Sequence, residues 1–233
     1  MKIAVISDIH GNLEALNAVL AKIDALGVQI IFCLGDIVGY GPNPNECVEL
    51  IRSRQILCVA GNHDKAVTGE HSIESFSQIA KAGVLWTKSV ITEEHEEYLV
   101  SLPYSIQEHN ILFVHSSPDK SEEFRYLLSA EDARESFHYF TNPLCFIGHT
   151  HRPGIFCEEN GITIIRPGKK FIINVGSVGQ PRDGNWKSCF ALLDTEYYTM
   201  EFVRVEYDVE TVCKKIKVLG LPQKLADRLL VGV

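Results

Sequence analysis

The chain has 233 residues, of which 45% are apolar. That is enough to bury the core of one large domain or two small ones, and it excludes bulk disorder. The 22 basic and 30 acidic side chains give a net charge of −8, with a pI near 5.6. This balance excludes a broad basic face for non-specific nucleic-acid binding, but not a small charged substrate, because bound metal ions can outweigh the global charge locally.

The first sixty residues alternate between short apolar strands and helical patterns. Asn12 stands where a helix N-cap is expected, and Gly27 ends the helical spacing of leucine and isoleucine that follows it. Strand, helix, strand, helix, strand predicts a parallel sheet with right-handed crossovers. The strands are expected at residues 2–7, 29–36 and 56–62, and the helices at 13–26 and 42–53.

The rest of the chain changes from helices to strands. Residues 70–102 are rich in Glu and helical in pattern, and a partial lid is one role for them. Residues 105–118 predict a hairpin that turns at His109–Asn110. A helix at 130–138 then leads to a strand at 144–153, antiparallel strands at 155–205 and helix at 209–231. No linker or repeat interrupts this pattern, so we expect one α/β domain over residues 1–233.

Seven cysteines without a CxxC pair predict a reducing, cytoplasmic setting and give no zinc-ribbon spacing. The opening "MKIAVISDIH" lacks the basic leader and long apolar core of a signal peptide. No run approaches the roughly 18 apolar residues that a membrane span needs. We therefore expect no membrane partner.

Polar side chains stand at the ends of the predicted strands. Because ligands of open α/β sheets bind at the carboxyl ends of the strands, five strand ends can deliver these side chains to one crevice. The candidates are Asp8, His10, Asp36, Asn62, His63, Asp64, His115, His149 and His151.

Each of these pieces alone has an ordinary explanation, such as a turn, a helix cap or an exposed loop. Together, two carboxylates, one amide and four histidines suit two borderline divalent cations, such as Mn, Fe, Co, Ni or Zn. Two such ions carry four positive charges, whereas Asp8 and Asp36 supply two negative ones, so the site attracts an anion, and phosphate is the obvious one. Two ions roughly 3.5–4 Å apart can activate water and clamp the phosphoryl oxygens of an in-line displacement.

The strand-end residues stand in five short motifs: "SDIHGN" (7–12), "GDIVGYGP" (35–42), "GNHD" (61–64), "VHSSP" (114–118) and "GHTHRP" (148–153). These motifs resemble, in order and approximate spacing, those of the calcineurin-like metallophosphoesterases. The resemblance runs from Asp8 to about Arg182 and is strongest to a small bacterial and archaeal, phosphodiesterase-like branch. It implies a four-layer α/β/β/α sandwich, which agrees with a parallel first half and an antiparallel second half.

The resemblance also implies a role for each side chain. His63 would not bind metal but would face the phosphate, as a general acid or as a charge on the leaving oxygen, and Asp64 would orient the His63 imidazole. Asp36 would bridge the two ions. One ion would be held by Asp8, His10, Asp36 and His151, and the other by Asp36, Asn62, His115 and His149.

Asn12, Tyr40 and Arg182 are the candidate substrate contacts. Tyr40 is equally well explained as a turn aromatic packed on the core or as a wall of the substrate site. Arg182 is either a solvated loop residue or a phosphate clamp, since a guanidinium binds phosphate bidentately. The histidines outside the motifs are expected to be surface or locally bonded residues: His71, His95, His109 and His138.

The predicted function is hydrolysis of a phosphate ester by a bridging hydroxide at a two-metal site, with a phosphodiester or nucleotide-type substrate. A phosphoprotein or small-molecule monoester phosphatase is the alternative enzyme, and an inactive interaction scaffold of the same fold is the alternative outside enzymes. The sequence leaves open a homo-oligomer, because the apolar tail "LADRLLVGV" (225–233) could cover its own core or a neighbour's.

Overall fold

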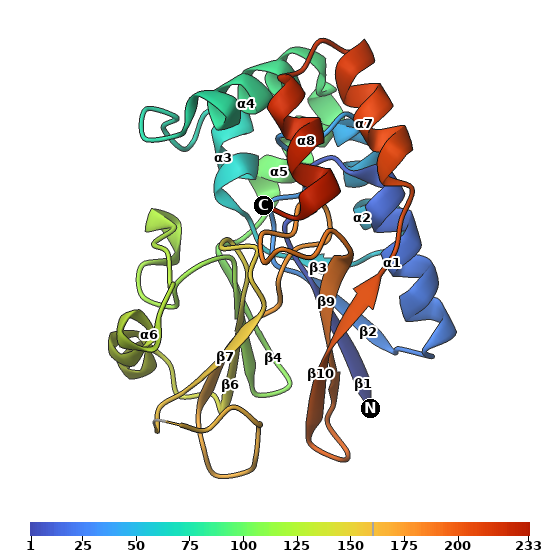
Figure 1. Cartoon of the computed structure of the whole chain (residues 1–233). Helices are drawn as coiled ribbons and strands as arrows, with labels where there is room; N and C mark the ends of the chain where they lie inside the picture. Colours follow the sequence, from blue (N-terminus) through green and yellow to red (C-terminus); the bar gives the residue numbers. More distant parts are fainter. Residues whose placement is uncertain (160) are drawn as a thin grey trace.

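The computed structural model describes residues 1–159 and 161–233 and contains two five-stranded sheets that pack face to face (Figure 1). Helices cover the outer face of each sheet, so the predicted four-layer α/β/β/α sandwich is confirmed. The first sheet has the order β10 (Thr199–Val205), β9 (Ser188–Asp194), β1 (Lys2–Ile6), β2 (Ile30–Cys33) and β3 (Leu57–Cys58). The second has the order β4 (Ser105–Glu108), β5 (Ile111–Val114), β6 (Leu144–Ile147), β8 (Phe171–Asn174) and β7 (Gly154–Cys157).

Both sheets mix strand directions. β1, β2 and β3 are parallel, as the alternating pattern predicts, and β9 and β10 join them antiparallel. In the second sheet β4–β5 and β7–β8 are antiparallel, but β5, β6 and β8 run parallel. The expectation of a wholly antiparallel second half is therefore wrong for β8, which reaches β6 by a crossover rather than by a hairpin.

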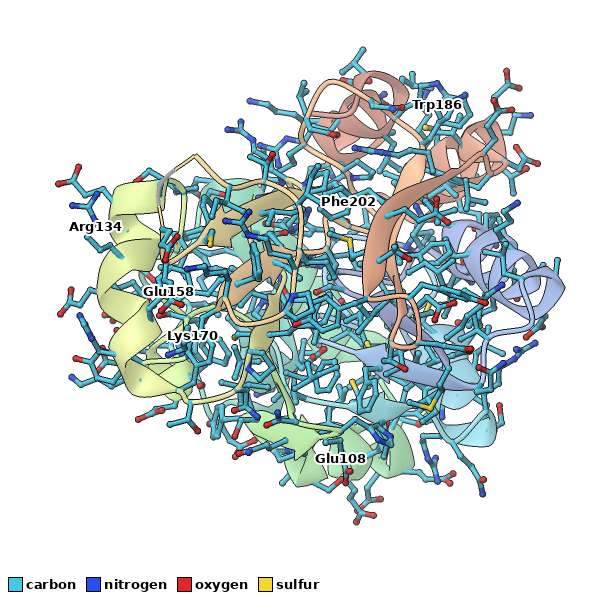
Figure 2. The ribbon with its side chains drawn as sticks, turned by 90° about the horizontal axis from the view of Figure 1, so that it is seen from below. Glu108, Arg134, Glu158, Lys170, Trp186 and Phe202 are labelled. Atoms are coloured by element: carbon cyan, nitrogen blue, oxygen red, sulfur yellow. The ribbon has the colours of Figure 1, made fainter. Side chains whose placement is uncertain are left out.

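The layer between the two sheets is apolar and aromatic. On β1, Ile3 and Val5 point into this layer, while Ala4 and Ile6 face the helices on the other side, which is the two-residue period of a strand buried on both faces. The rings of Phe32 and Phe113, one from each sheet, stack with centroids 3.9 Å apart. Seen from below in Figure 2, Phe202 lies near the middle of the molecule, and it packs against this layer.

Among the described residues, seven helices pack on the core of the first sheet, and one, α6, lies beside the second sheet and covers it (Figure 1). The segment that follows α6 is held by Lys170 (labelled in Figure 2), whose ammonium group donates to the carbonyls of Phe137 and Phe140, each at 2.6 Å. The helices are α1 (Leu13–Ala25), α2 (Pro44–Ser53), α3 (Asn62–Thr68), α4 (Gln78–Val90), α5 (Glu93–Ser101), α6 (Ala130–Ser136), α7 (Val209–Val218) and α8 (Gln223–Val231).

Several elements differ from their predicted bounds. β3 has only two residues, and the polar residues after it open helix α3 instead of forming a turn. Residues 70–77 are not helical, although α4 and α5 follow as expected. Of the strands expected at 155–166, only β7 is formed among the described residues. The predicted hairpin is confirmed, since His109 and Asn110 take the positive φ angles of a tight turn.

The C-terminal tail packs on its own chain. Leu225, Ala226 and Leu229 of α8 are buried in the core beneath the helices of the first sheet. Among residues 1–159 and 161–233, no helix combines the length and the apolar character that crossing a bilayer requires.

Candidate active site at the carboxyl ends of the strands

The loops that follow the parallel strands of both sheets meet at one edge of the sandwich. The backbone N–H of His10 donates to the carbonyl of Asp36 at 2.9 Å, which ties the loop after β1 to the loop after β2. The N–H of His149 donates to Oδ2 of Asp8 at 3.0 Å, which ties the second sheet to the first. The structure thereby brings together the side chains that the sequence places at strand ends: Asp8, His10, Asp36, Asn62, His63, His115, His149 and His151.

Two glycines of the motifs allow this close approach. A Cβ at Gly61 would lie 2.1 Å from Oδ1 of Asp36, and one at Gly148 would lie 2.0 Å from Oγ of Ser7. Both contacts are far inside van der Waals distance, so neither position has room for a side chain. The glycines of "GNHD" and "GHTH" therefore serve the packing of one loop against another.

The first cluster of donor atoms combines His10, His151 and Asp8. Nδ1 of His10 bonds the carbonyl of Val38 at 3.1 Å, and Nδ1 of His151 bonds the carbonyl of Gln180. A carbonyl only accepts, so each Nδ1 carries the proton and each Nε2 carries a lone pair. The Nε2 atoms of His10 and His151 nevertheless lie 3.1 Å apart, and Oδ1 of Asp8 lies 3.3 Å from Nε2 of His151. Three acceptors at such distances repel one another unless a cation or a proton lies between them.

The second cluster combines His115, His149, Asn62 and Asp36. Nε2 of His115 lies 3.2 Å from Oδ1 of Asn62, 3.2 Å from Nδ1 of His149 and 3.4 Å from Oδ2 of Asp36. The same Oδ2 of Asp36 lies 3.6 Å from Nε2 of His10 in the first cluster. One carboxylate oxygen therefore faces both clusters.

This donor set fits two divalent metal ions. Ligands about 2.1 Å from an ion stand roughly 3.0–3.4 Å from one another, from simple trigonometry on tetrahedral and octahedral spheres. Most of the separations above fall in or near that range. Oδ1 of Asp8 is also buried without a hydrogen-bond partner in the described chain, which is costly unless a cation binds it. The residues that would hold the ions are those that the motifs indicate.

The electrostatics of the site also favour bound cations. Burial lowers the pKa of His10, His149 and His151 well below the usual range, so these imidazoles are neutral and free to act as ligands. Burial opposes charge on His115 too, but the Asp36 carboxylate overcomes it and raises the pKa of His115 to about 9. Asp36 thus attracts a positive charge, which a proton supplies when no metal ion does.

Five of these residues adopt backbone conformations that are rare for side chains with a Cβ. Their φ angles lie between 51° and 66°, and each such residue costs on the order of 1 kcal/mol. Strain of this kind persists only where the surrounding structure enforces it, and it clusters at functional sites. The residues are Asp8, His10, Asp36, His149 and His151.

No hydrogen bond joins the carboxylate of Asp64 to the imidazole of His63 in the described chain, although Asp64 is the residue expected to orient this ring. Its carboxylate accepts four backbone N–H groups at 2.7–3.2 Å, which belong to Asp36, Ile37, Val38 and Gly61. Burial raises the pKa of Asp64 to about 7, while these donors act in the opposite direction. Asp64 therefore joins the start of α3 to the loop that carries Asp36.

His63 is held by packing rather than by a carboxylate. Its ring lies 4.5 Å from that of Tyr40 and 5.0 Å from that of Phe76, and its Nδ1 is buried without a partner among the described residues. A Cβ at Gly39 would lie 2.4 Å from this Nδ1, so the imidazole of His63 packs directly against the backbone of Gly39. Nε2 is left for the cleft, and burial lowers the pKa of His63 to about 4.

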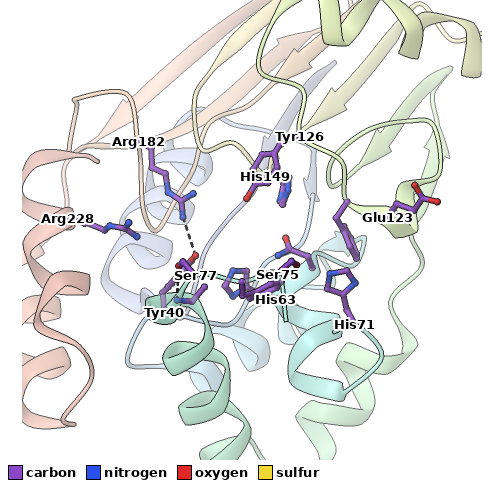
Figure 3. Close-up of a pocket in the computed structure, with 14 residues that line it drawn as sticks. Tyr40, His63, His71, Ser75, Ser77, Glu123, Tyr126, His149, Arg182 and Arg228 are labelled. Atoms are coloured by element: carbon purple, nitrogen blue, oxygen red, sulfur yellow. Dashed lines mark hydrogen bonds between the residues drawn. The ribbon is translucent and has the colours of Figure 1, made fainter. Parts of the chain in front are cut away.

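A cleft of about 420 Å³ opens above the two clusters (Figure 3). Tyr40 and Arg182, two of the expected substrate contacts, line it. Asn12, the third, does not, because its amide caps α1 by accepting from the N–H of Ala15 at 3.1 Å and donates to the carbonyl of Gly179 at 2.8 Å. Asn12 is therefore the N-cap that the sequence predicts.

Other cleft residues lie outside the motifs and could not be found from them. His71, expected to be a surface or locally bonded residue, is half-buried and lines the cleft beside Phe124. Tyr126 stacks on His149, a candidate metal ligand, with ring centroids 3.9 Å apart. Arg228 reaches the cleft from α8, at the far end of the sequence. Only the position of this basic residue in a mostly apolar tail could have hinted at it.

Comparisons with known proteins identify the family of this fold and site. Residues 1–197 match the model of the calcineurin-like phosphoesterase superfamily domain, and the chain belongs to this family. It is accordingly a metal-dependent phosphoesterase, a hydrolase that acts on phosphate ester bonds.

Relatives share nearly the whole chain. The protein MJ0912 of Methanocaldococcus jannaschii is 45% identical over 240 residues, covering 99% of this chain and 98% of its own. The phosphodiesterase YfcE of Escherichia coli K12 is 26% identical over 84% of this chain and 89% of its own. A crystal structure of a metallophosphoesterase from Sphaerobacter thermophilus superposes with a TM-score of 0.88 at 39% identity, covering 100% of this chain and 99% of the other.

Proposed function

We propose that the protein hydrolyses phosphodiesters or nucleotide-type phosphate esters at a two-metal site. The observation that carries this proposal is the Asp36 carboxylate oxygen, which faces both donor clusters at the floor of the cleft. One ion would be held by Asp8, His10, Asp36 and His151, and the other by Asp36, Asn62, His115 and His149. The donor types suit Mn, Fe, Co, Ni or Zn.

The metal ions, when bound, would polarise the phosphoryl oxygens and activate a water molecule as the nucleophile. His63 stands beside this floor and is neutral at pH 7, since burial lowers its pKa to about 4. An arriving phosphate anion favours the charged imidazole, so binding of substrate raises the pKa of His63 and lets it donate a hydrogen bond or a proton to the leaving oxygen.

Arg182 and Tyr40 would position the substrate. Nη2 of Arg182 donates to Oε1 of Gln180 at 2.9 Å, which fixes the direction of the guanidinium, and it lies 3.5 Å from the Tyr40 hydroxyl. Nε of Arg182 is buried without a partner in the described chain. A phosphoryl oxygen would satisfy this donor, and the charge would neutralise the anion.

A diester is favoured over a monoester by the relative YfcE, which is named as a phosphodiesterase. The Arg182 guanidinium is the observation that favours the alternative, a monoester phosphatase, since a monoester carries one more negative charge to neutralise. The seven cysteines all carry free thiols, six of them buried, which supports a reducing, cytoplasmic setting.

The test is an assay of the purified protein with Mn²⁺, using p-nitrophenyl phosphate as the monoester and bis(p-nitrophenyl) phosphate as the diester. We expect turnover of the diester to exceed that of the monoester. His63→Ala should lower kcat by about 10²-fold or more while the metal content stays at the wild-type level. Exposed His138 gives the matched control, His138→Ala, which should change neither. Absence of turnover with every borderline metal would refute the proposal.

A further inference from the structure

One side of the cleft carries two arginine side chains that belong to neither donor cluster. Arg182 enters from the loop after β8, and Arg228 enters from α8. Figure 3 shows both guanidiniums reaching into the cleft from the same side, with Glu123 at the opposite end. The chain as a whole has a net charge of −8, so this local excess runs against its overall balance.

Neither guanidinium is neutralised by the protein. In the part of the chain that the structure describes, the arginines within ion-pair distance of a carboxylate are Arg52, Arg54, Arg125 and Arg204. Glu123, the acidic residue of the cleft lining, pairs instead with Lys120 at 2.8 Å. Two guanidiniums on one wall without a carboxylate are expected where a ligand supplies the negative charge.

The N-terminus of α4 adds to the same wall. Ser77, its N-cap, and the preceding Ser75 and Phe76 line the cleft, and Oγ of Ser77 accepts the N–H of Ala80 at 3.3 Å. The N–H groups of the first helical turn have no partner within the helix, and no acidic residue in that turn offsets the helix dipole. A helix N-terminus of this kind favours an anion, and this one lines the same cleft as the two arginines.

The Tyr40 hydroxyl lies close to the charges of both arginines. Burial raises the pKa of Tyr40, and the guanidiniums of Arg182 and Arg228 both act against that rise, so both charges lie close to this hydroxyl. Nη2 of Arg182 lies 3.5 Å from this hydroxyl, and the guanidinium carbon stands 5.8 Å from the centroid of the Tyr40 ring. Tyr40 and the two arginines line the same cleft as Asn62 and His149 of the second cluster.

We propose that Arg228, Arg182 and the N-terminus of α4 form a second anion-binding subsite, which selects substrates with a second phosphate group beside the one at the metal clusters. Nucleoside diphosphates and other esters with linked phosphates have this chemistry, whereas a simple monoester or diester lacks the second anion. The inference rests on the proposed function, because it assumes that the first phosphate sits at the metal clusters.

The test measures binding, so that it does not depend on turnover. Calorimetry on the manganese-loaded protein would compare adenosine 5′-monophosphate with the non-hydrolysable α,β-methylene analogue of adenosine 5′-diphosphate, in excess Mn²⁺. The wild type should bind the analogue about tenfold more tightly or better, as expected for one added charge-assisted contact. Arg228→Gln should remove most of that preference. Lys224→Gln removes the same charge from an exposed position on α8 and should leave the preference as in the wild type.

Equal affinity of the wild type for the two ligands would overturn the subsite. So would an Arg228→Gln variant that weakens both ligands alike, because Arg228 would then act on the first phosphate or on folding. Failure of the proposed function shows itself separately, as absence of turnover of the chromogenic esters by the same metal-loaded wild type.

Discussion

Asp36 is the residue on which both donor clusters depend. Its Oδ2 faces His10 on one side and His115 on the other, while its Oδ1 accepts the N–H of His63 at 2.8 Å. The carboxylate therefore fixes the start of α3 as well as the electrostatics of the two clusters. His63 contacts the same carboxylate only through its backbone, so its imidazole is free to act on the substrate.

This difference predicts distinct metal contents for two variants. Asp36→Ala should lose both ions, because a single carboxylate serves the two clusters, and its turnover should fall below detection. His63→Ala should keep both ions. Metal analysis of the purified proteins after dialysis against Mn²⁺ distinguishes them. Equal metal loss in the two variants would show that His63 is a ligand, and retention of both ions by Asp36→Ala would contradict its shared role.

At the scale of elements, Asp64 connects two motifs that are far apart in sequence. Its carboxylate receives N–H groups from the loop after β2 and from Gly61 at the N-cap of α3. Asp64→Ala leaves these buried donors without their acceptor, and each unsatisfied group costs about 1–3 kcal/mol before water or the backbone adjusts.

We therefore expect Asp64→Ala to lower the free energy of unfolding by about 3 kcal/mol or more, measured by urea denaturation. Asp64→Asn keeps the shape and one acceptor oxygen, so its loss should be smaller. An orienting role toward His63 would give another result, namely wild-type stability with a kcat as low as that of His63→Ala.

The loop between β5 and α6 carries the aromatic side chains that cover the second cluster. Arg125 holds it by donating to both carboxylate oxygens of Asp119 at 2.8 Å and to Oγ of Ser136 at 3.2 Å. Its neighbours Phe124 and Tyr126 thereby keep their places beside His115 and His149.

Arg125→Met keeps the apolar stem but removes these bonds, so Tyr126 should lose its fixed position over His149. We expect KM for aryl phosphate esters to rise by about three- to tenfold, which corresponds to roughly 1 kcal/mol, with little change in kcat. Steady-state kinetics of the variant would show this split. The exposed Arg134→Met on α6 is the control, and a fall in kcat at constant KM would contradict a role in substrate positioning.

The sequence predicts the elements and the strand-end residues well, because both depend on local patterns. The periodicity of β1, α1 and β2 is strong, and polar residues directly after apolar runs are conspicuous. The parallel pairing of β6 with β8, the role of Asp64 and the approach of Arg228 depend on contacts between distant segments, which no local pattern encodes. The positive φ angles of Asp8 and His10 are equally invisible, since these residues rarely adopt them and only the packed loops enforce them.

At the scale of the whole molecule, the candidate metal site draws its side chains from both sheets. Asp8, His10 and Asp36 come from the first sheet, whereas His115, His149 and His151 come from the second. Ions bound by both groups stabilise the contact between the sheets, and their loss leaves lone pairs facing one another and five strained residues without compensation.

Metal removal should therefore lower thermal stability in a manner that depends on pH. An ion at about 100 times its Kd adds about 2.7 kcal/mol, or roughly 5–10 °C in Tm for a chain of this size. In the metal-free protein the proton on His115 stabilises the fold, because the pKa of about 9 exceeds the usual 6.5. That contribution is complete below pH 6.5 and is lost as the pH rises through 9.

A bound ion replaces this proton, so the metal-loaded protein does not lose the same stability as the pH rises. The difference in Tm between protein with Mn²⁺ and protein with chelator should widen between about pH 6.5 and pH 9, as measured by calorimetry at several pH values. Asp36→Ala, which lacks the shared carboxylate, should show no difference at any pH. If the difference in Tm between the two forms of the wild type stays constant over this pH range, His115 does not exchange its proton for the metal ion.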